Sequence, residues 1–143
     1  MFGLVMGTGK IKVLIVDDSE DEAMLLKRSL RKSDCCEVIA LLPDGQAALD
    51  YLLGTSRYAD REQFPLPDVL LLDFKLPRMN GLEVLAWVRE RNPGLHVIML
   101  SNSFSPDSLA HCLQMGARHC LEKAEPAQDA RRIEGFLKSL PDK

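Results

Sequence analysis

The sequence predicts an α/β fold in which a parallel sheet is covered by helices on both faces. The clearest signal is Val69–Leu72, an unbroken run of branched apolar residues followed by the lone carboxylate Asp73. A strand that is apolar on both pleat faces is typical of a parallel sheet buried between helices. The second signal is that five short strand-like runs alternate with five segments of helical periodicity, without an internal repeat. This alternation favours parallel strands joined by right-handed crossovers.

Length and charge narrow the class of protein. The chain has 143 residues, enough for one domain with an ordinary core, and a formal net charge of −3. The mild charge argues against a nucleic-acid-binding module, which carries a basic patch. No secretory signal is present, and no apolar run approaches the ~20 residues of a membrane span. We therefore expect a flexible leader at residues 1–9, one domain at 10–143, and a cytoplasmic protein without membrane or nucleic-acid partners.

The four cysteines are not spaced as metal ligands. Cys35 and Cys36 are adjacent, whereas Cys112 and Cys120 lie far along the chain. A zinc site is unsupported because no C-x-x-C spacing is present. We expect free thiols in a reducing cytoplasm.

The first strand is expected at Lys10–Val16, where β-branched residues dominate. Ser19 followed by Glu22 three residues later predicts a capping box, which satisfies the free amides at a helix start. Basic residues near the expected end of this helix suit its dipole. The residues spaced for the buried face of the helix are Ala23, Leu26 and Leu30.

The second strand is expected at Glu37–Leu42, and Asp44 opens the second helix, with Ala48 and Leu52 on one face. The following connection, Gly54–Pro67, is polar, lacks periodicity and ends in two prolines. A connection of this length is either functional or mobile.

The third strand is expected at Asp68–Asp73, and Pro77 marks the loop after it. Asn80 caps the third helix, with Glu83 at the matching position of a capping box. Asn92 and the Pro-Gly pair after it end this helix. Its predicted apolar stripe is Leu82, Leu85 and Val88.

The fourth strand is expected at His96–Leu100, and Ser105 caps the next helix with a proline in its first turn. Gly116 ends that helix, and the weaker fifth strand follows at Arg118–Glu122. Pro126 starts the last helix, and Ile133 and Leu137 are spaced for its buried face. Four further apolar residues of the last two helices could belong to the core or to a dimer seam, and we expect the core for each. They are Leu109, Leu113, Phe136 and Leu140.

Polar residues close four of the predicted strands, namely Asp17 with Asp18, Asp73, Ser101 and Lys123. Taken singly, each has a plainer explanation, such as a helix N-terminus, a turn or a solvated lysine. If the strands are neighbours, however, these ends meet at one edge of the sheet, where ligands of open α/β folds bind. Gathered carboxylates repel one another, and Mg²⁺, a hard cation that takes one or two carboxylates and keeps several waters, relieves that repulsion. A carboxylate beside Mg²⁺ is suited to nucleophilic attack on phosphorus.

These motifs together resemble those of response-regulator receiver domains over about residues 10–140. The resemblance implies a flavodoxin-like, doubly wound five-stranded sheet in the order 2-1-3-4-5. The long connection, with Tyr58, is similar to stand-alone regulators of the cyanobacterial-phytochrome type. The segments that carry the wider resemblance are Val16–Ser19, Leu71–Asp73, Leu76–Gly81, Leu100 with Ser101, Met115–Ala117 and Lys123.

The resemblance also implies a magnesium site. Asp18 is expected to bind Mg²⁺ directly and Asp17 mainly through water. Asp73 is expected to be both a metal ligand and the phosphoacceptor, and the backbone carbonyl of Lys75 is expected to complete the protein ligands.

The family's signalling partners follow from the same resemblance. The expected phosphoryl donor is a phosphohistidine on a sensor kinase or a histidine phosphotransfer protein. Ser101 and Lys123 are expected to contact the phosphoryl group on Asp73. No output domain is expected, so the signal would pass to a downstream protein target or through a homodimer.

Two positions depart from the family pattern. Ala124 follows Lys123 where receivers usually have proline, and the proline comes at Pro126. Cys120 stands where the family often has a switching tyrosine or phenylalanine, with His119 before it. We interpret His119 as a surface residue, and the route by which a signal reaches the last strand stays open.

Two other functions are weighed against the switch. An aspartyl-nucleophile phosphatase would need an acid two residues after Asp73, and Lys75 stands there. A docking module without phosphorylation is disfavoured by the complete set of acids, hydroxyl and lysine. We therefore expect self-phosphorylation and self-dephosphorylation chemistry only, not a turnover enzyme.

Overall fold

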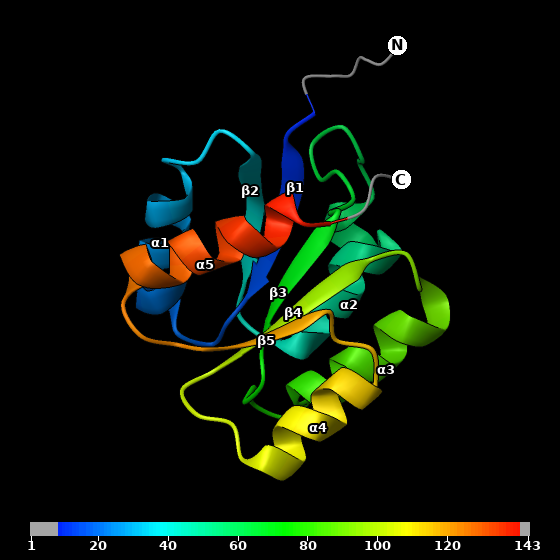
Figure 1. Ribbon diagram of the computed structural model, residues 1–143. Helices are drawn as coiled ribbons and strands as arrows, with labels where there is room; N and C mark the ends of the chain where they lie inside the picture. Colours follow the sequence, from blue (N-terminus) through cyan, green and yellow to red (C-terminus); the bar gives the residue numbers. More distant parts are fainter. Residues whose placement is uncertain (1–8, 141–143) are drawn as a thin grey trace.

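A single parallel sheet forms the centre of the computed structural model (Figure 1), with its strands in the order β2-β1-β3-β4-β5. This order confirms the one implied by the resemblance to receiver domains. The structure describes residues 9–140, so the predicted leader at 1–9 lies almost wholly outside the described residues. The strands are β1 (Ile11–Val16), β2 (Cys36–Leu42), β3 (Val69–Asp73), β4 (His96–Ser101) and β5 (His119–Glu122).

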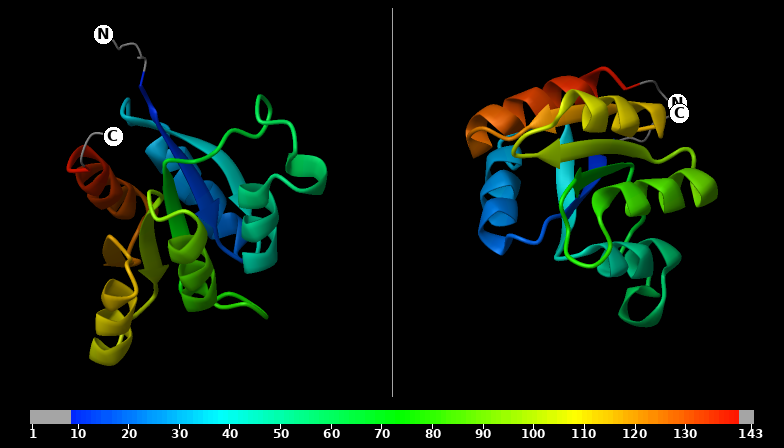
Figure 2. Two further views of the ribbon diagram at one scale, coloured as in Figure 1. Left: turned by 90° about the vertical axis from the view of Figure 1, so that its right-hand side faces the viewer. Right: turned by 90° about the horizontal axis from the view of Figure 1, so that it is seen from below.

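Helices cover both faces of the sheet (Figures 1 and 2). On one face, α1 and α5 pack on the side chains of Val13, Ile15 and their neighbours. On the other face, α2, α3 and α4 pack on the alternate side chains, among them Leu14 and Val16. The helices are α1 (Glu20–Leu30), α2 (Gly45–Leu53), α3 (Gly81–Arg91), α4 (Pro106–Gln114) and α5 (Pro126–Lys138).

β3 is the strand on which both cores depend. All four residues of Val69–Leu72 are fully buried, with Leu70 and Leu72 on one face and Val69 and Leu71 on the other. Each such side chain contributes about 1.5–3 kcal/mol when it leaves water. The strand is therefore fixed in the sheet, and Asp73 is fixed at its end.

The connection between α2 and β3 is packed against the domain. It contains the short helix η1 (Ser56–Tyr58), and the rings of Tyr51, Tyr58 and Phe64 lie with centroids 5.0–6.1 Å apart. The Tyr51 hydroxyl donates to the carbonyl of Pro65 at 2.8 Å, and Arg61 donates to two backbone carbonyls. The aromatic residues thus hold the connection in place.

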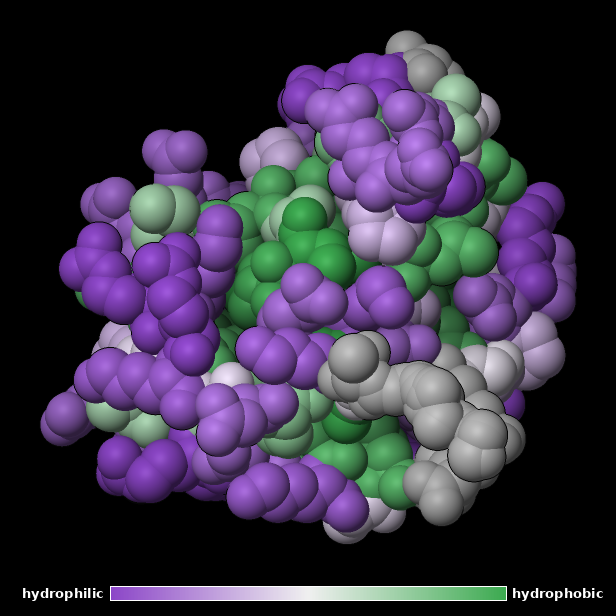
Figure 3. Space-filling model, turned by 90° about the horizontal axis from the view of Figure 1, so that it is seen from above, coloured by the Kyte–Doolittle hydropathy of each residue, from purple (hydrophilic) through white to green (hydrophobic). Residues whose placement is uncertain are grey.

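Figure 3 views the molecule from the end at which β1 begins. Hydrophilic side chains cover most of this face, around a smaller hydrophobic area. All strands are parallel, so they finish together at the opposite end. That opposite end gathers the polar residues predicted to close the strands.

Two core predictions on α4 are wrong. The side chains of Leu109 and Leu113 are exposed, by 38% and 47% of their surface, and Cys112 is the buried residue of this helix. The helical period is the same for either ridge, so the spacing alone did not show which one faces the sheet. Phe136 and Leu140 are half-buried and pack against the α1–α5 core.

One predicted capping box is only half formed. The Ser19 hydroxyl accepts from the Glu22 amide at 3.2 Å, but the Ser19 amide donates to Asp17 Oδ1 instead of to Glu22. In α3 the box is complete, since Asn80 and Glu83 each bond the other's backbone amide. The Glu22 carboxylate is therefore released from the helix end, and its partner lies in the site described below.

The exposure of α4 leads to a stability prediction. We expect Leu109→Gln and Leu113→Gln each to change the free energy of unfolding by no more than about 0.5 kcal/mol. Leu85→Ala, at a fully buried position of α3, should cost about 2–5 kcal/mol because it leaves a cavity. Urea denaturation measures all three, and a loss above about 2 kcal/mol for Leu113→Gln would contradict the placement of α4.

Candidate functional site

The carboxyl ends of four neighbouring strands bring the predicted site residues together. Asp17 follows β1, Asp73 ends β3, Ser101 ends β4 and Lys123 follows β5. The register pairs Val16 with Leu72, Asp73 with Leu100, and Ser101 with Glu122, so these ends stand level. Side chains that are far apart in sequence thus share one edge of the sheet.

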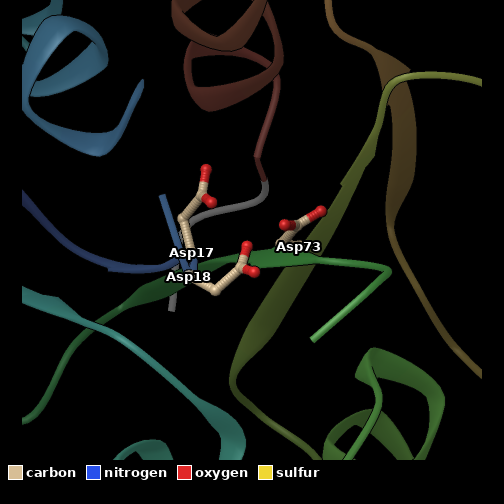
Figure 4. Close-up of side chains that lie close together, drawn as sticks. All are labelled: Asp17, Asp18 and Asp73. Carbon is tan, nitrogen blue, oxygen red and sulfur yellow. The ribbon is translucent and has the colours of Figure 1, made fainter. Parts of the chain in front are cut away.

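Three carboxylates form a cluster at this edge (Figure 4). Asp17, Asp18 and Asp73 each offer one oxygen, and these oxygens lie within 4.8 Å of one another. Asp17 and Asp73 are buried, whereas Asp18 is exposed. Carboxylate oxygens at this spacing suit a hard divalent cation such as Mg²⁺. The residues present therefore fit the magnesium ion implied by the sequence.

Asp73 is the most perturbed acid of the cluster. Its side chain is only 9% exposed, and burial raises its pKa from 3.8 to about 6. Asp17 and Asp18 add to this rise by repulsion, while Lys123 and the backbone amide of Lys75 oppose it. The raised pKa means that the charged form of Asp73 is disfavoured, and a nearby cation would stabilise that form.

Lys123 supplies the fixed positive charge. Its Nζ lies 3.2 Å from Asp17 Oδ2, 3.1 Å from Glu22 Oε1 and 3.6 Å from Asp73 Oδ1. Burial would lower the pKa of this lysine, but Asp73, Asp17 and Glu22 outweigh that effect and raise it. Lys123 is thus held in its charged form among three acids.

Ser101 lies at the site, but its hydroxyl group forms hydrogen bonds with the loop that follows β4. It is buried, its hydroxyl donates to the Ser103 carbonyl at 2.8 Å, and it accepts from the Ser103 amide at 3.3 Å. Ser101 and Lys75 line the same open hollow of about 230 Å³ above Asp73. The role of the Lys75 carbonyl as a metal ligand stays a prediction.

Gly81 allows the loop after Asp73 to close over the strand end. A Cβ at this position would lie 2.6 Å from the Asp73 carbonyl oxygen and 2.9 Å from Phe74 Cα. Such distances exclude any side chain, and the Gly81 amide donates to the Phe74 carbonyl at 3.0 Å. The start of α3 is thereby packed directly against the backbone that carries Asp73.

The loop after Lys123 is held by a residue that the sequence reasoning missed. The Ala124 amide donates to both oxygens of Asp129, at 3.0 and 3.2 Å, and Asp129 is buried near the start of α5. A proline after Lys123 could not make this bond because it has no amide hydrogen. Ala124 therefore stabilises this loop through a hydrogen bond that the proline usual in the family could not make.

The positions before Lys123 also differ from the expectation. The Cys120 thiol contacts the Cys112 thiol of α4, and burial raises the pKa of Cys120 to about 12. His119 is half-buried, more enclosed than a surface residue but still partly exposed, and stacks on Phe136 of α5 with ring centroids 3.9 Å apart. The four cysteines are free thiols.

The family model of the response regulator receiver domain matches residues 13–133. The chain belongs to the response regulator receiver family. Receiver domains are modules of two-component systems that bind Mg²⁺ at an acidic site and usually take phosphoryl groups from histidine kinases. The acidic cluster at the ends of β1 and β3 has the composition of such a site.

Single-domain regulators are among the relatives. The chain is 31% identical over 131 residues to the response regulator Rcp1 of Synechocystis, covering 90% of this chain and 86% of Rcp1. It is 34% identical over 122 residues to the probable methanogenesis regulatory protein FilR2 of Methanothrix harundinacea, covering 84% of this chain and 76% of that protein. These relatives are regulators, not enzymes.

Solved structures give the same picture. The phosphorylated cyanobacterial phytochrome response regulator RcpA superposes with a TM-score of 0.79 at 28% identity, covering 91% of this chain and 95% of RcpA. The Mn²⁺-bound form of Rcp1 superposes with a TM-score of 0.78 at 28% identity, covering 92% and 97%. The expected likeness to phytochrome response regulators is therefore confirmed.

One of the relatives is an enzyme. The chain also matches a protein-glutamate methylesterase/protein-glutamine glutaminase of Cereibacter sphaeroides, but it spans only 32% of that enzyme, so the enzymatic activity does not transfer. Within residues 9–140, no helix has the length and apolar character needed to cross a membrane.

The raised pKa of Asp73 predicts a pH-dependent stability in metal-free protein. An acid whose pKa is higher in the folded state binds its proton more tightly there. Its stabilising contribution is therefore full below pH 3.8 and is lost as the pH rises through about 6. We expect Asp73→Asn to raise the free energy of unfolding at about pH 7.5 by roughly 1–2 kcal/mol and to have little effect near pH 4.

Thermal and urea unfolding in a chelator measure this difference, with the exposed Asp34→Asn as the matched control. Added Mg²⁺ should stabilise the unmodified protein more than Asp73→Asn, because the variant lacks one carboxylate ligand. A variant that is less stable at neutral pH, or a gain independent of pH, would show that Asp73 is not under electrostatic strain.

Proposed function

We propose that this protein is a stand-alone cytoplasmic response regulator that accepts a phosphoryl group on Asp73. The observation that carries the proposal is the environment of Asp73, which is buried beside two acids with Lys123 Nζ at 3.6 Å. The donor is a phosphohistidine on a sensor histidine kinase or a histidine phosphotransfer protein. The likeness to Rcp1 and RcpA supports this reading.

The transfer is an in-line displacement at phosphorus. An oxygen of Asp73 forms the new P–O bond while the P–N bond to the donor histidine breaks, and the electron pair returns to the imidazole, which leaves neutral because its other nitrogen is protonated. When bound by Asp17, Asp18 and Asp73, with the Lys75 carbonyl as a further ligand, Mg²⁺ neutralises charge on the phosphoryl oxygens.

Two side chains then move to the new group. Lys123 turns from its carboxylate partners toward one phosphoryl oxygen. The Ser101 hydroxyl gives up its hydrogen bond to the Ser103 carbonyl and donates to a second phosphoryl oxygen. The phosphoryl group brings roughly −1.5 to −2 charge at pH 7. It therefore favours the state of the protein in which both donors face Asp73.

A chain of contacts can transmit the movement of Ser101 to β5. Ser103 precedes Phe104, whose amide donates to Glu122 of β5 at 3.0 Å and whose ring lies 5.6 Å from Phe74. Many receiver domains have a switching aromatic residue at the position that Cys120 occupies in this chain. Here the contacts of Phe104 link the loop after β4 to β5 instead. The signal leaves through a protein contact on the face of α4, β5 and α5.

The exposed leucines of α4 suit such a contact. Leu109 and Leu113 lie four residues apart and so share one side of the helix. A downstream protein target or a second copy of this chain would cover them. Neither nucleic acid nor a membrane is needed for this output.

The test is phosphorylation by acetyl phosphate with Mg²⁺, followed by intact-mass measurement. We expect one phosphoryl adduct on the unmodified protein and on the control Asp34→Asn. The adduct should be absent from Asp73→Asn, because the amide is not a nucleophile, and absent when Mg²⁺ is chelated. An adduct that persists in Asp73→Asn would place the modification elsewhere and reject the assignment.

A further inference from the structure

Glu22 occupies an unexpected position beside the site. Its carboxylate lies 3.1 Å from Lys123 Nζ, closer than Asp17 at 3.2 Å or Asp73 at 3.6 Å. Glu22 belongs to the first turn of α1, and its side chain is 54% exposed. The shortest ion pair of Lys123 is therefore made with an acid on the outer side of the site.

The structure explains why Glu22 is free to make this contact. In a complete capping box its carboxylate would accept from the Ser19 amide, but that amide donates to Asp17 Oδ1 at 2.9 Å. The Ser19 hydroxyl still caps α1 through the Glu22 amide. The start of the helix therefore does not need the Glu22 carboxylate, which extends to Lys123.

Glu22 also differs from the other acids around the lysine. Asp17 and Asp73 belong to the carboxylate cluster that fits a metal ion, and Glu22 does not. A metal at the cluster would neutralise part of the charge of both aspartates and so weaken their attraction for Lys123. Glu22 is then the acid that remains to hold the ammonium group.

The pair also separates two hollows. Glu22 and Lys123 line the hollow above Asp73 and, on their other side, a cavity of about 210 Å³ between α1 and the start of α5. The Glu22 contact draws Nζ toward α1, whereas phosphoryl oxygens on Asp73 would draw it into the first hollow. The two positions compete for one ammonium group.

We propose that Glu22 is a positioning residue that holds Lys123 on the α1 side of the site and so opposes phosphorylation. The inference rests on the proposed role of Asp73 as phosphoacceptor. It gives Glu22 a role in setting how readily the switch turns on, through the lysine rather than through the phosphoryl group. Weakening this pair frees the lysine for the phosphorylated state.

The experiment measures the affinity of the full chain for beryllofluoride, a non-covalent phosphoryl mimic, by calorimetry with Mg²⁺ present. We expect Glu22→Gln to bind about two- to fivefold more tightly, the size expected when one exposed ion pair is removed. Glu20→Gln is the matched control, because Glu20 is an exposed acid of the same helical turn. It should bind like the unmodified protein.

A second pair of variants tests whether the effect passes through the lysine. In a Lys123→Gln background, Glu22→Gln should give no further gain, because the group that it holds is absent. A gain of the same size there would mean that Glu22 repels the anion directly, and the positioning role would be wrong.

The outcomes separate this inference from the function on which it rests. Equal or weaker binding by Glu22→Gln, while the unmodified protein binds, would overturn only the role of Glu22. No binding of beryllofluoride by the unmodified protein would overturn the proposed function and this role together.

Discussion

The electrostatic balance around Lys123 is the constraint on which the site depends. One ammonium group stands among Asp17, Glu22 and Asp73, at distances of 3.1–3.6 Å. Without it, buried carboxylates of like charge would face one another in a region of reduced dielectric, where repulsion is strong. The lysine offsets part of that repulsion. Burial, with a smaller contribution from the neighbouring aspartates, still raises the pKa of Asp73. The site thus retains a negative charge that favours a bound cation.

The sheet imposes this arrangement. β3 is buried on both faces, so Asp73 cannot move away from its neighbours without disturbing two cores. The pairing of Val16 with Leu72 places the acids after β1 beside it, and Gly81 lets α3 begin against its backbone. Packing of apolar residues therefore holds the charged groups in a geometry that they would not adopt by themselves. The free energy for this comes from the cores, not from the site.

The gathering of the site residues was predictable from the strand ends on the condition that their strands are neighbours, and the resemblance to receiver domains supplied the strand order. An apolar run that stops at Asp73, and polar residues at the ends of other runs, are local signals with one geometric consequence in a parallel sheet. The errors concern choices between local alternatives. The spacing of Leu109 and Leu113 fits either face of α4, and Glu22 fits a cap as well as an ion pair. The Glu22–Lys123 contact joins residues 101 positions apart, which no local pattern reveals. The bond from Ala124 to Asp129 was missed for a similar reason.

The contacts described also bound the energy of switching. Ser101 would exchange a hydrogen bond to a carbonyl, of about 0.5–1.5 kcal/mol, for one to a charged oxygen, of about 1.5–3 kcal/mol. Lys123 would give up an exposed pair with Glu22, of about 0–1 kcal/mol, together with its contact to Asp17, for a contact with a dianion. Each exchange favours the phosphorylated arrangement by only a small amount. A difference of a few kcal/mol is what allows one phosphoryl group to shift the population between two states, and its loss to restore the first.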